Sequence, residues 1–243
     1  MMPRHFLLAL SFLTRIPVPD LGKLEAPDFA RAALFYPLVG LLIGVLLCLP
    51  LLLFPHAQAL LLAAMLVVLW AMLTGGLHLD GLADSADAWL GGFGDVEKTH
   101  RILKDPLVGA AGVVALIGVL LLKFAALAVI LENGHWWAVL LAPAVGRALI
   151  LLLFLTTPYV RAGGLASAVT EHLPREPALW VTVITFAVAM LFSLQGLFTA
   201  VLGFWLLRRM MVQRIQGCTG DTAGASVEIG EMLWLVGVAL SVG

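Results

Sequence analysis

Three aspartates and a histidine follow directly on a strongly apolar segment of this sequence. Ala57 to Leu77 contains no Asp, Glu, Lys or Arg, and His78, Asp80, Asp84 and Asp87 come next. Ionised carboxylates at the edge of hydrocarbon need a compensating cation. Three of them on one short segment favour a divalent metal, and hard oxygen ligands suit Mg²⁺, which commonly binds one or two carboxylates together with substrate phosphates.

The spacing of the aspartates predicts that they share one face of a helix. Asp80, Asp84 and Asp87 stand at i, i+4 and i+7, which places them within about 60° of one another around the helix axis. Like charges so placed repel unless a cation lies between them. The alternative is a solvated helix start, where capping and the helix dipole favour Asp. His78 fits an interfacial histidine with satisfied hydrogen bonds as well as it fits a catalytic one.

Basic residues follow the acidic segment. Lys98 and Arg101 are explained equally well by anchoring to anionic lipid, whereas Lys104 and Asp105 adjoin the next apolar segment and are better functional candidates. Arg147 lies inside an apolar segment, where an unpaired guanidinium is costly, so we expect it to pair with an aspartate or a substrate phosphate.

A glycine-rich segment near the end of the chain is a third candidate. Residues 217–226 combine glycines, hydroxyl side chains and one acid, a composition that can hold phosphate through backbone amides. Gly217, Thr219 and Gly220 are the candidate phosphate contacts, and Asp221 is a candidate metal ligand. The spacing is not that of a Walker loop, and a polar turn between two helices is the alternative.

The N-terminal segment contributes another cation. Residues 12–19 carry Arg15 ahead of two prolines, and this rigid, non-helical ending is consistent with a re-entrant segment that presents Arg15. The apolar stretch before it is short and has no small-x-small cleavage site, so we expect it to be retained rather than removed as a signal peptide.

Composition identifies a membrane protein. Of the 243 residues 62% are hydrophobic and only 12% are charged, whereas about a quarter of the residues of a soluble domain are charged. The formal net charge of -1 gives no basic excess, so a nucleic-acid partner is not expected. The two cysteines are too few and too differently placed for a disulfide framework or a zinc site.

Apolar segments long enough to cross a membrane predict an all-α, polytopic transmembrane bundle that forms one domain over residues 1–243. The segments are 32–54, 57–77, 106–131, 136–159, 178–207 and a short last one at 232–243. Residues 178–207 are too many for one span, so Ser193 to Gly196 is interpreted as the tip of a hairpin, which gives about seven spans. A single span there, giving six, is the alternative.

The positive-inside rule favours seven spans with a cytoplasmic N-terminus. With the hairpin, every Lys and Arg except Lys123 and Arg147 falls on one side of the membrane. Lys123 lies nearer the opposite face and is expected to extend its ammonium toward that surface. The same topology places the segments around Arg15, Asp80 and Asp221 on the cytoplasmic side, where they can meet.

Taken together, residues 12–19, 75–87, 104–105 and 217–231 resemble the cobalamin synthase family, the adenosylcobinamide-GDP ribazoletransferases. The similarity spans nearly the whole chain, and its most specific parts are residues 78–84 and 12–19. It implies a Mg²⁺-dependent multi-pass enzyme of the bacterial cytoplasmic membrane, active at the cytoplasmic face, that performs a late joining step in assembling the nucleotide loop of vitamin B12. It implies a corrinoid nucleotide and α-ribazole as substrates and lipid as surroundings, and leaves open a homo-oligomer or a complex with other cobalamin-assembly enzymes.

The resemblance also implies roles for individual residues. Mg²⁺ would be held against the diphosphate of adenosylcobinamide-GDP by Asp80, Asp84, Asp87 and Asp221. Phosphate charge would be neutralised by Arg15, Lys104 and Arg147. A ribose hydroxyl of α-ribazole, or of its 5′-phosphate, would attack the phosphorus attached to cobinamide, and GMP would leave. His78 or Asp105 would take the hydroxyl proton, and the sequence does not choose between them.

Other functions use similar residues. Intramembrane prenyltransferases also bind Mg²⁺-diphosphate through Asp-rich helices, but a second Asp-rich motif is missing here. The Asp80-Gly81 step is similar to the aspartate motif of CDP-alcohol phosphotransferases, which suggests related chemistry and not necessarily a shared fold. A cation transporter, from a different class, should carry its acids near the membrane midplane on broken helices, whereas these acids cluster at one face.

Overall fold

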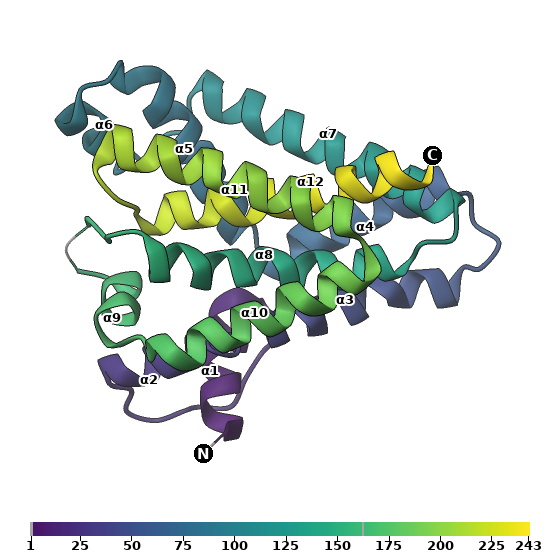
Figure 1. Cartoon of the computed structure of the whole chain (residues 1–243), viewed down its shortest axis with the longest axis horizontal. Helices are drawn as coiled ribbons and strands as arrows, with labels where there is room; N and C mark the ends of the chain where they lie inside the picture. Colours follow the sequence, from purple (N-terminus) through teal and green to yellow (C-terminus); the bar gives the residue numbers. More distant parts are fainter. Residues whose placement is uncertain (1, 162) are drawn as a thin grey trace.

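The computed structural model describes residues 2–161 and 163–243, and within these ranges the chain is helical without a β-strand (Figure 1). The helices are α1 (Met2–Leu13), α2 (Ala26–Ala33), α3 (Tyr36–Leu53), α4 (Ala59–Thr74), α5 (Leu77–Gly92), α6 (Val96–Ile102), α7 (Ala110–Glu132), α8 (Trp137–Thr156), α9 (Leu165–His172), α10 (Arg175–Phe192), α11 (Leu194–Ile215) and α12 (Gly220–Val242). The predicted all-α bundle is therefore confirmed.

The long helices run back and forth along one axis of the bundle. Helices α3, α7, α8, α10 and α12 are each long and apolar enough to cross a membrane, and the bent pair α4 and α5 would make a sixth span. Helix α11 runs beside α12 in the same bundle (Figure 1), but Arg208 and Arg209 interrupt its apolar sequence. A seventh crossing and the orientation of the N-terminus stay predictions.

The surface of the bundle is apolar where lipid would surround it. Large aliphatic side chains are strongly exposed on the outer helices, with Leu52 at 76%, Leu60 at 59% and Leu191 at 82%. Helices α8 and α12 occupy the centre, since 83% and 61% of their apolar windows are buried, against 17% for α10. This arrangement matches a bundle whose solvent is hydrocarbon rather than water.

The predicted hairpin within residues 178–207 is confirmed. Helices α10 and α11 meet at Ser193, whose side chain caps α11 by accepting a hydrogen bond from the amide of Gly196 at 3.0 Å. The prediction for the end of the chain is wrong, because the last helix is not the short segment 232–243. It starts at Gly220 and continues to Val242 without a break.

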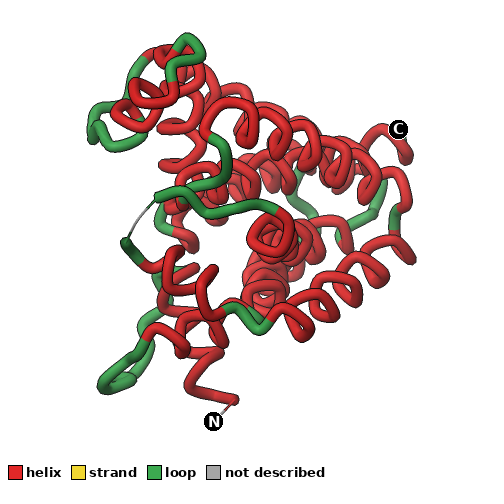
Figure 2. Tube along the Cα trace, turned by 60° about the vertical axis from the view of Figure 1, so that its left-hand side comes forward, coloured by secondary structure: helices red, strands yellow, loops and turns green. Residues whose placement is uncertain are grey.

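The connections at the two ends of the bundle differ in length. The helices that do not cross, α1, α2, α5, α6 and α9, gather at the end that also carries the longer loops, while short turns join the long helices at the other end (Figure 2). After α1 ends at Leu13, the amide of Arg15 donates to the carbonyl of Leu73 at 2.8 Å. The predicted non-helical segment around Arg15 is thereby tied to the end of α4.

Candidate functional site

A sharp turn between α4 and α5 positions the aspartate segment. Gly75 and Gly76 have φ angles of +63° and +72°, in the left-handed region that glycine adopts without strain, and the two helices are bent by 92° relative to each other. Helix α4 supplies the crossing part of this broken span, and α5 turns away from it at the end of the bundle (Figure 1). Asp80, Asp84 and Asp87 all lie on α5, as their spacing predicts.

The carboxylate of Asp84 lies near three other carboxylates. Its pKa is raised from the usual 3.8 to about 6, first by burial and then by the nearby carboxylates of Asp80, Asp221 and Asp87. The guanidinium of Arg161 acts in the opposite direction but is outweighed. A cation placed among these carboxylates would relieve the repulsion.

Helix α12 brings Asp221 to the same cluster. Asp221 lies in the first turn of α12, and its Oδ2 accepts a hydrogen bond from Nη1 of Arg161 at 2.9 Å. The backbones of α5 and α12 approach closely here, because a Cβ atom at Gly81 would lie 2.6 Å from the carbonyl oxygen of Asp221. The structure thus unites two segments that are 140 residues apart in the sequence. Sequence reasoning missed Arg161, which stands in a loop without a recognisable motif.

Asp87 has a structural role that its sequence position does not indicate. Its Oδ2 accepts the amide hydrogen of Gly109 at 2.7 Å, and its Oδ1 accepts that of Gly112 at 2.9 Å. These amides belong to the start of α7, so Asp87 caps that helix and fixes α5 against it. Both carboxylate oxygens are engaged in this way, and metal ligation by Asp87 stays a prediction.

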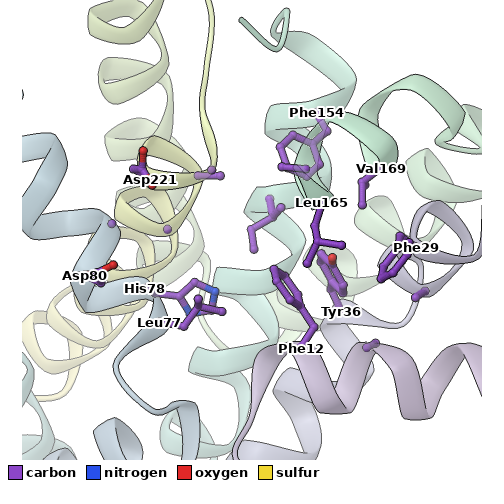
Figure 3. Close-up of a pocket in the computed structure, with 18 of the residues that line it drawn as sticks. Phe12, Phe29, Tyr36, Leu77, His78, Asp80, Phe154, Leu165, Val169 and Asp221 are labelled. Atoms are coloured by element: carbon purple, nitrogen blue, oxygen red, sulfur yellow. The ribbon is translucent and has the colours of Figure 1, made fainter. Parts of the chain in front are cut away.

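Two cavities lie on either side of Asp80. The first, which we call the apolar cavity, encloses about 190 Å³ and is lined chiefly by apolar side chains of α1, α2, α3, α8 and α9, with Asp80 and Asp221 on the facing wall (Figure 3). The second, which we call the polar cavity, encloses about 470 Å³ and includes Arg15, Thr14 and Thr74 in its lining. Asp80 lines both cavities, so molecules in the two could meet at its carboxylate.

The structure places the two candidate proton acceptors, His78 and Asp105, in different surroundings. His78 lines the apolar cavity, is 4% exposed, and its Nδ1 has no hydrogen-bond partner in the described part of the chain. Asp105 is exposed, accepts the amide hydrogen of Leu107 at 3.0 Å, and lines neither cavity.

Lys104 also lies outside both cavities. Its side chain is exposed at the loop after α6, and it is absent from the lining of the apolar and polar cavities. The structure therefore places Arg15 in the lining of the polar cavity together with Asp80, whereas Lys104 lies outside both cavities. A phosphate contact by Lys104 stays a prediction.

Arg147 does not occupy the position that the sequence suggests for a phosphate ligand. Its side chain is fully buried in α8, and Nη1 donates to the Oε1 of Glu231 on α12. The expectation of a carboxylate partner is met by a glutamate rather than an aspartate. The Nε and Nη2 atoms of Arg147 have no hydrogen-bond partner in the described part of the chain, and a phosphate contact by this residue stays a prediction.

Lys123 is part of the same buried network, and the prediction that it extends to the membrane surface is wrong. Its Nζ donates to Glu228 Oε2 and to Glu231 Oε2, both at 2.6 Å, and lies 4.4 Å from the ring centroid of Trp70. The network pairs two cations with two carboxylates and connects α7, α8 and α12. Burying charges is costly unless they are paired and hydrogen-bonded, so this pairing explains why charged residues persist in apolar helices.

The predicted phosphate-binding segment is mostly structural. Thr219 is 1% exposed and caps α12 in a reciprocal pair with Thr222, so its hydroxyl is already used. Gly217 is buried where residues 158–160 pass alongside, and a Cβ there would collide with the carbonyl oxygen of Pro158. Gly220, by contrast, is exposed and lines the apolar cavity. Of the three, only Gly220 faces the site.

We call Asp80, Asp84 and Asp221 the acidic cluster. Their carboxylate oxygens are the kind of ligand that a hard divalent cation prefers. The charges of Asp80 and Asp221 add to burial in raising the pKa of Asp84. In residues 2–161 and 163–243, no three His, Cys, Asp or Glu side chains lie close enough to hold a metal by themselves. Mg²⁺ commonly completes its coordination with substrate phosphates and water, so a substrate would have to supply the remaining ligands.

Comparison with known proteins points to one family. The family described as cobalamin-5-phosphate synthase matches residues 5–239. The adenosylcobinamide-GDP ribazoletransferase of Pseudomonas putida (strain W619) is 52% identical over 240 residues, which cover 97% of this chain and 98% of that protein. The protein of the same name from Pseudomonas entomophila (strain L48) is 52% identical over 241 residues, with 98% and 99% covered. No solved structure matches the chain.

Proposed function

The chain belongs to the cobalamin-5-phosphate synthase family, and from this premise we propose how its acidic cluster and two cavities perform the reaction. The protein is a transferase of cobalamin biosynthesis that joins adenosylcobinamide-GDP with α-ribazole. In this reaction a ribose hydroxyl forms a new bond to the phosphorus attached to cobinamide. The bond from that phosphorus to the bridging oxygen breaks, and GMP leaves with that oxygen.

Asp80, Asp84 and Asp221 are the residues that would hold Mg²⁺. The observation that carries this proposal is geometric, because Asp80 lines both cavities and Asp221 lines the apolar cavity beside it. When bound, the ion supplies positive charge against the diphosphate. Phosphoryl transfer depends mostly on positioning and electrostatic stabilisation, so a site for the cation is the main chemical requirement.

The polar cavity is the proposed site for the diphosphate of the donor. Arg15 lines this cavity together with Asp80, and its side chain packs against the turn at Gly75. Its exposed guanidinium can form paired hydrogen bonds with phosphate oxygens. Arg161, whose guanidinium already binds Asp221, is a second cation within reach of the cluster.

His78 is the proposed acceptor of the hydroxyl proton, and its Nδ1 is the free atom that would take it. Of the two candidates, only His78 lines a cavity. We expect it to contribute about 10²-fold to the rate, at the lower end of general base catalysis.

We also propose that the site faces the cytoplasm across a bacterial inner membrane. The end of the bundle with the longer loops carries the cations of α6 and of the C-terminal part of α11 (Figure 1). Such an excess of Lys and Arg is typical of the cytoplasmic side. A homo-oligomer or a complex with other cobalamin-assembly enzymes stays a prediction.

Turnover by the purified protein tests the proposed function. In detergent with adenosylcobinamide-GDP, α-ribazole and Mg²⁺, the wild type should release GMP only when both substrates are present. Asp80→Asn should reduce this rate by at least about 100-fold, whereas Glu132→Gln, a carboxylate change at the C-terminal end of α7, should leave it unchanged. Normal turnover by Asp80→Asn would contradict the proposed metal site.

A further inference from the structure

Four aromatic side chains form one wall of the apolar cavity. Phe12, Phe29, Tyr36 and Phe154 come from α1, α2, α3 and α8, and all four line it. Figure 3 shows these rings on one side of the space, with Asp80, Asp221 and His78 on the other. Aromatic side chains bind flat apolar ring systems through stacked and edge-to-face contacts. The wall is therefore suited to a planar aromatic group.

The size of the cavity limits what can enter it. Its volume of about 190 Å³ is below the range of roughly 300–1,000 Å³ that is usual for sites of drug-sized ligands. A corrinoid ring system is far larger than a drug-sized ligand and cannot fit. A single nucleoside base is the substrate fragment of suitable size and shape.

Two polar side chains of the lining are buried. Tyr36 is 5% exposed, and its hydroxyl lies among the side chains that surround the cavity (Figure 3). His78 is 4% exposed with an unpartnered Nδ1. Buried tyrosine hydroxyls usually find a hydrogen-bond partner, so the cavity offers polar contacts to a ligand that is otherwise apolar.

We propose that the apolar cavity binds the aromatic base of the acceptor nucleoside, α-ribazole, with the Tyr36 hydroxyl donating to a ring nitrogen. This inference rests on the proposed function. Phe12, Leu77 and Asp80 line both cavities, so a base held here directs its ribose toward Asp80. The reacting hydroxyl then meets the donor diphosphate where the two cavities join.

Filling the cavity tests this assignment. Ala166 on α9 lines the apolar cavity, whereas Ala168, two residues further along the same helix, does not. Ala166→Phe should raise the KM for α-ribazole by about tenfold or more, because small changes in an apolar pocket have effects of this size, and should leave the KM for adenosylcobinamide-GDP unchanged. Ala168→Phe should change neither. An unchanged KM for α-ribazole in Ala166→Phe overturns the proposal.

The Tyr36 hydroxyl has its own test. Tyr36→Phe keeps the ring and should weaken α-ribazole binding about two- to tenfold, the value of one neutral hydrogen bond. Equal effects on both substrates, or none on α-ribazole, would contradict the assigned contact.

Calorimetry with α-ribazole alone separates this proposal from the proposed function. If the wild type binds α-ribazole, and Ala166→Phe weakens that binding, the cavity assignment holds whether or not GMP is released. Failure of turnover refutes the function. Wild-type binding that Ala166→Phe does not weaken, as expected if the cavity holds a lipid chain instead, refutes the cavity assignment.

Discussion

Replacing Asp84 by Asn is expected to stabilise the metal-free protein while it lowers activity. The pKa of Asp84 is raised from 3.8 to about 6, which corresponds to about 3 kcal/mol of unfavourable ionisation. Because the carboxyl is only partly buried, solvent screening reduces this to about 1 kcal/mol. In a chain of this length, a gain of that size raises Tm by about 2–4 °C.

The effect should depend on pH with a defined sign. Asp84 binds its proton more tightly in the folded protein than in the unfolded chain, so the destabilisation grows as the pH rises from 3.8 and is complete above about 6. Thermal unfolding in detergent with a chelator, followed by tryptophan fluorescence, should therefore show Asp84→Asn more stable than the wild type at about pH 7. The difference should shrink at about pH 4.5.

Asp87→Asn is the matched control, because it makes the same substitution three residues further along α5. The Asp87 carboxylate accepts the amide hydrogens of Gly109 and Gly112, and an amide side chain has only one oxygen to replace both. The loss of one acceptor should cost about 1–3 kcal/mol and lower Tm. If Asp84→Asn also lowers Tm, or leaves it unchanged at neutral pH, the clustered charge inferred from the structure is absent.

Three further predictions concern the proton acceptor, the buried network and the metal. His78→Gln should lower kcat about 100-fold with both KM values unchanged, and an unaltered kcat in initial-rate assays would exclude His78 as the base. Lys123→Met leaves Glu228 and Glu231 with too little positive charge and should destabilise the fold by about 3–5 kcal/mol. Adding Glu228→Gln should recover most of that loss in thermal unfolding, and simple additivity would contradict the network. The apparent Mg²⁺ affinity should fall as the pH drops through about 6, because a proton then competes with the metal for Asp84. Mg²⁺ titrations of turnover at several pH values measure this affinity, and an affinity that does not change with pH would rule out Asp84 as a ligand.

Local features of the fold could be predicted from the sequence. The helical face of Asp80, Asp84 and Asp87 follows from their spacing, and the hairpin at Ser193 follows from the excess length of an uncharged segment. Both features depend on residues that are close together in the chain. The spacing of residues along a helix and the length of an apolar segment are therefore enough to predict them. The approach of residues 75–87 to the start of residues 217–231 also follows, because the predicted topology places both on the same side of the membrane.

Contacts between distant segments could not be predicted in this way. Every charged residue lowers the mean hydropathy of a segment, so Glu228 and Glu231 make the first half of α12 resemble a polar loop in the sequence. Their partners Lys123 and Arg147 lie on other helices and offset the free-energy cost of burying the two carboxylates. The sequence pattern within α12 does not show this pairing. For the same reason the pairing of Arg147 with Glu231 and that of Arg161 with Asp221 could not be predicted from the sequence.

Direct measurement of metal binding tests the central claim, that the carboxylates of α5 and α12 hold a divalent cation against the diphosphate. Mn²⁺ can be titrated into the purified protein with adenosylcobinamide-GDP present and followed by electron paramagnetic resonance. The wild type should bind the ion, and the double variant Asp80→Asn/Asp84→Asn should lose that binding while retaining a cooperative thermal transition. Equal Mn²⁺ affinity in the two proteins would contradict the account.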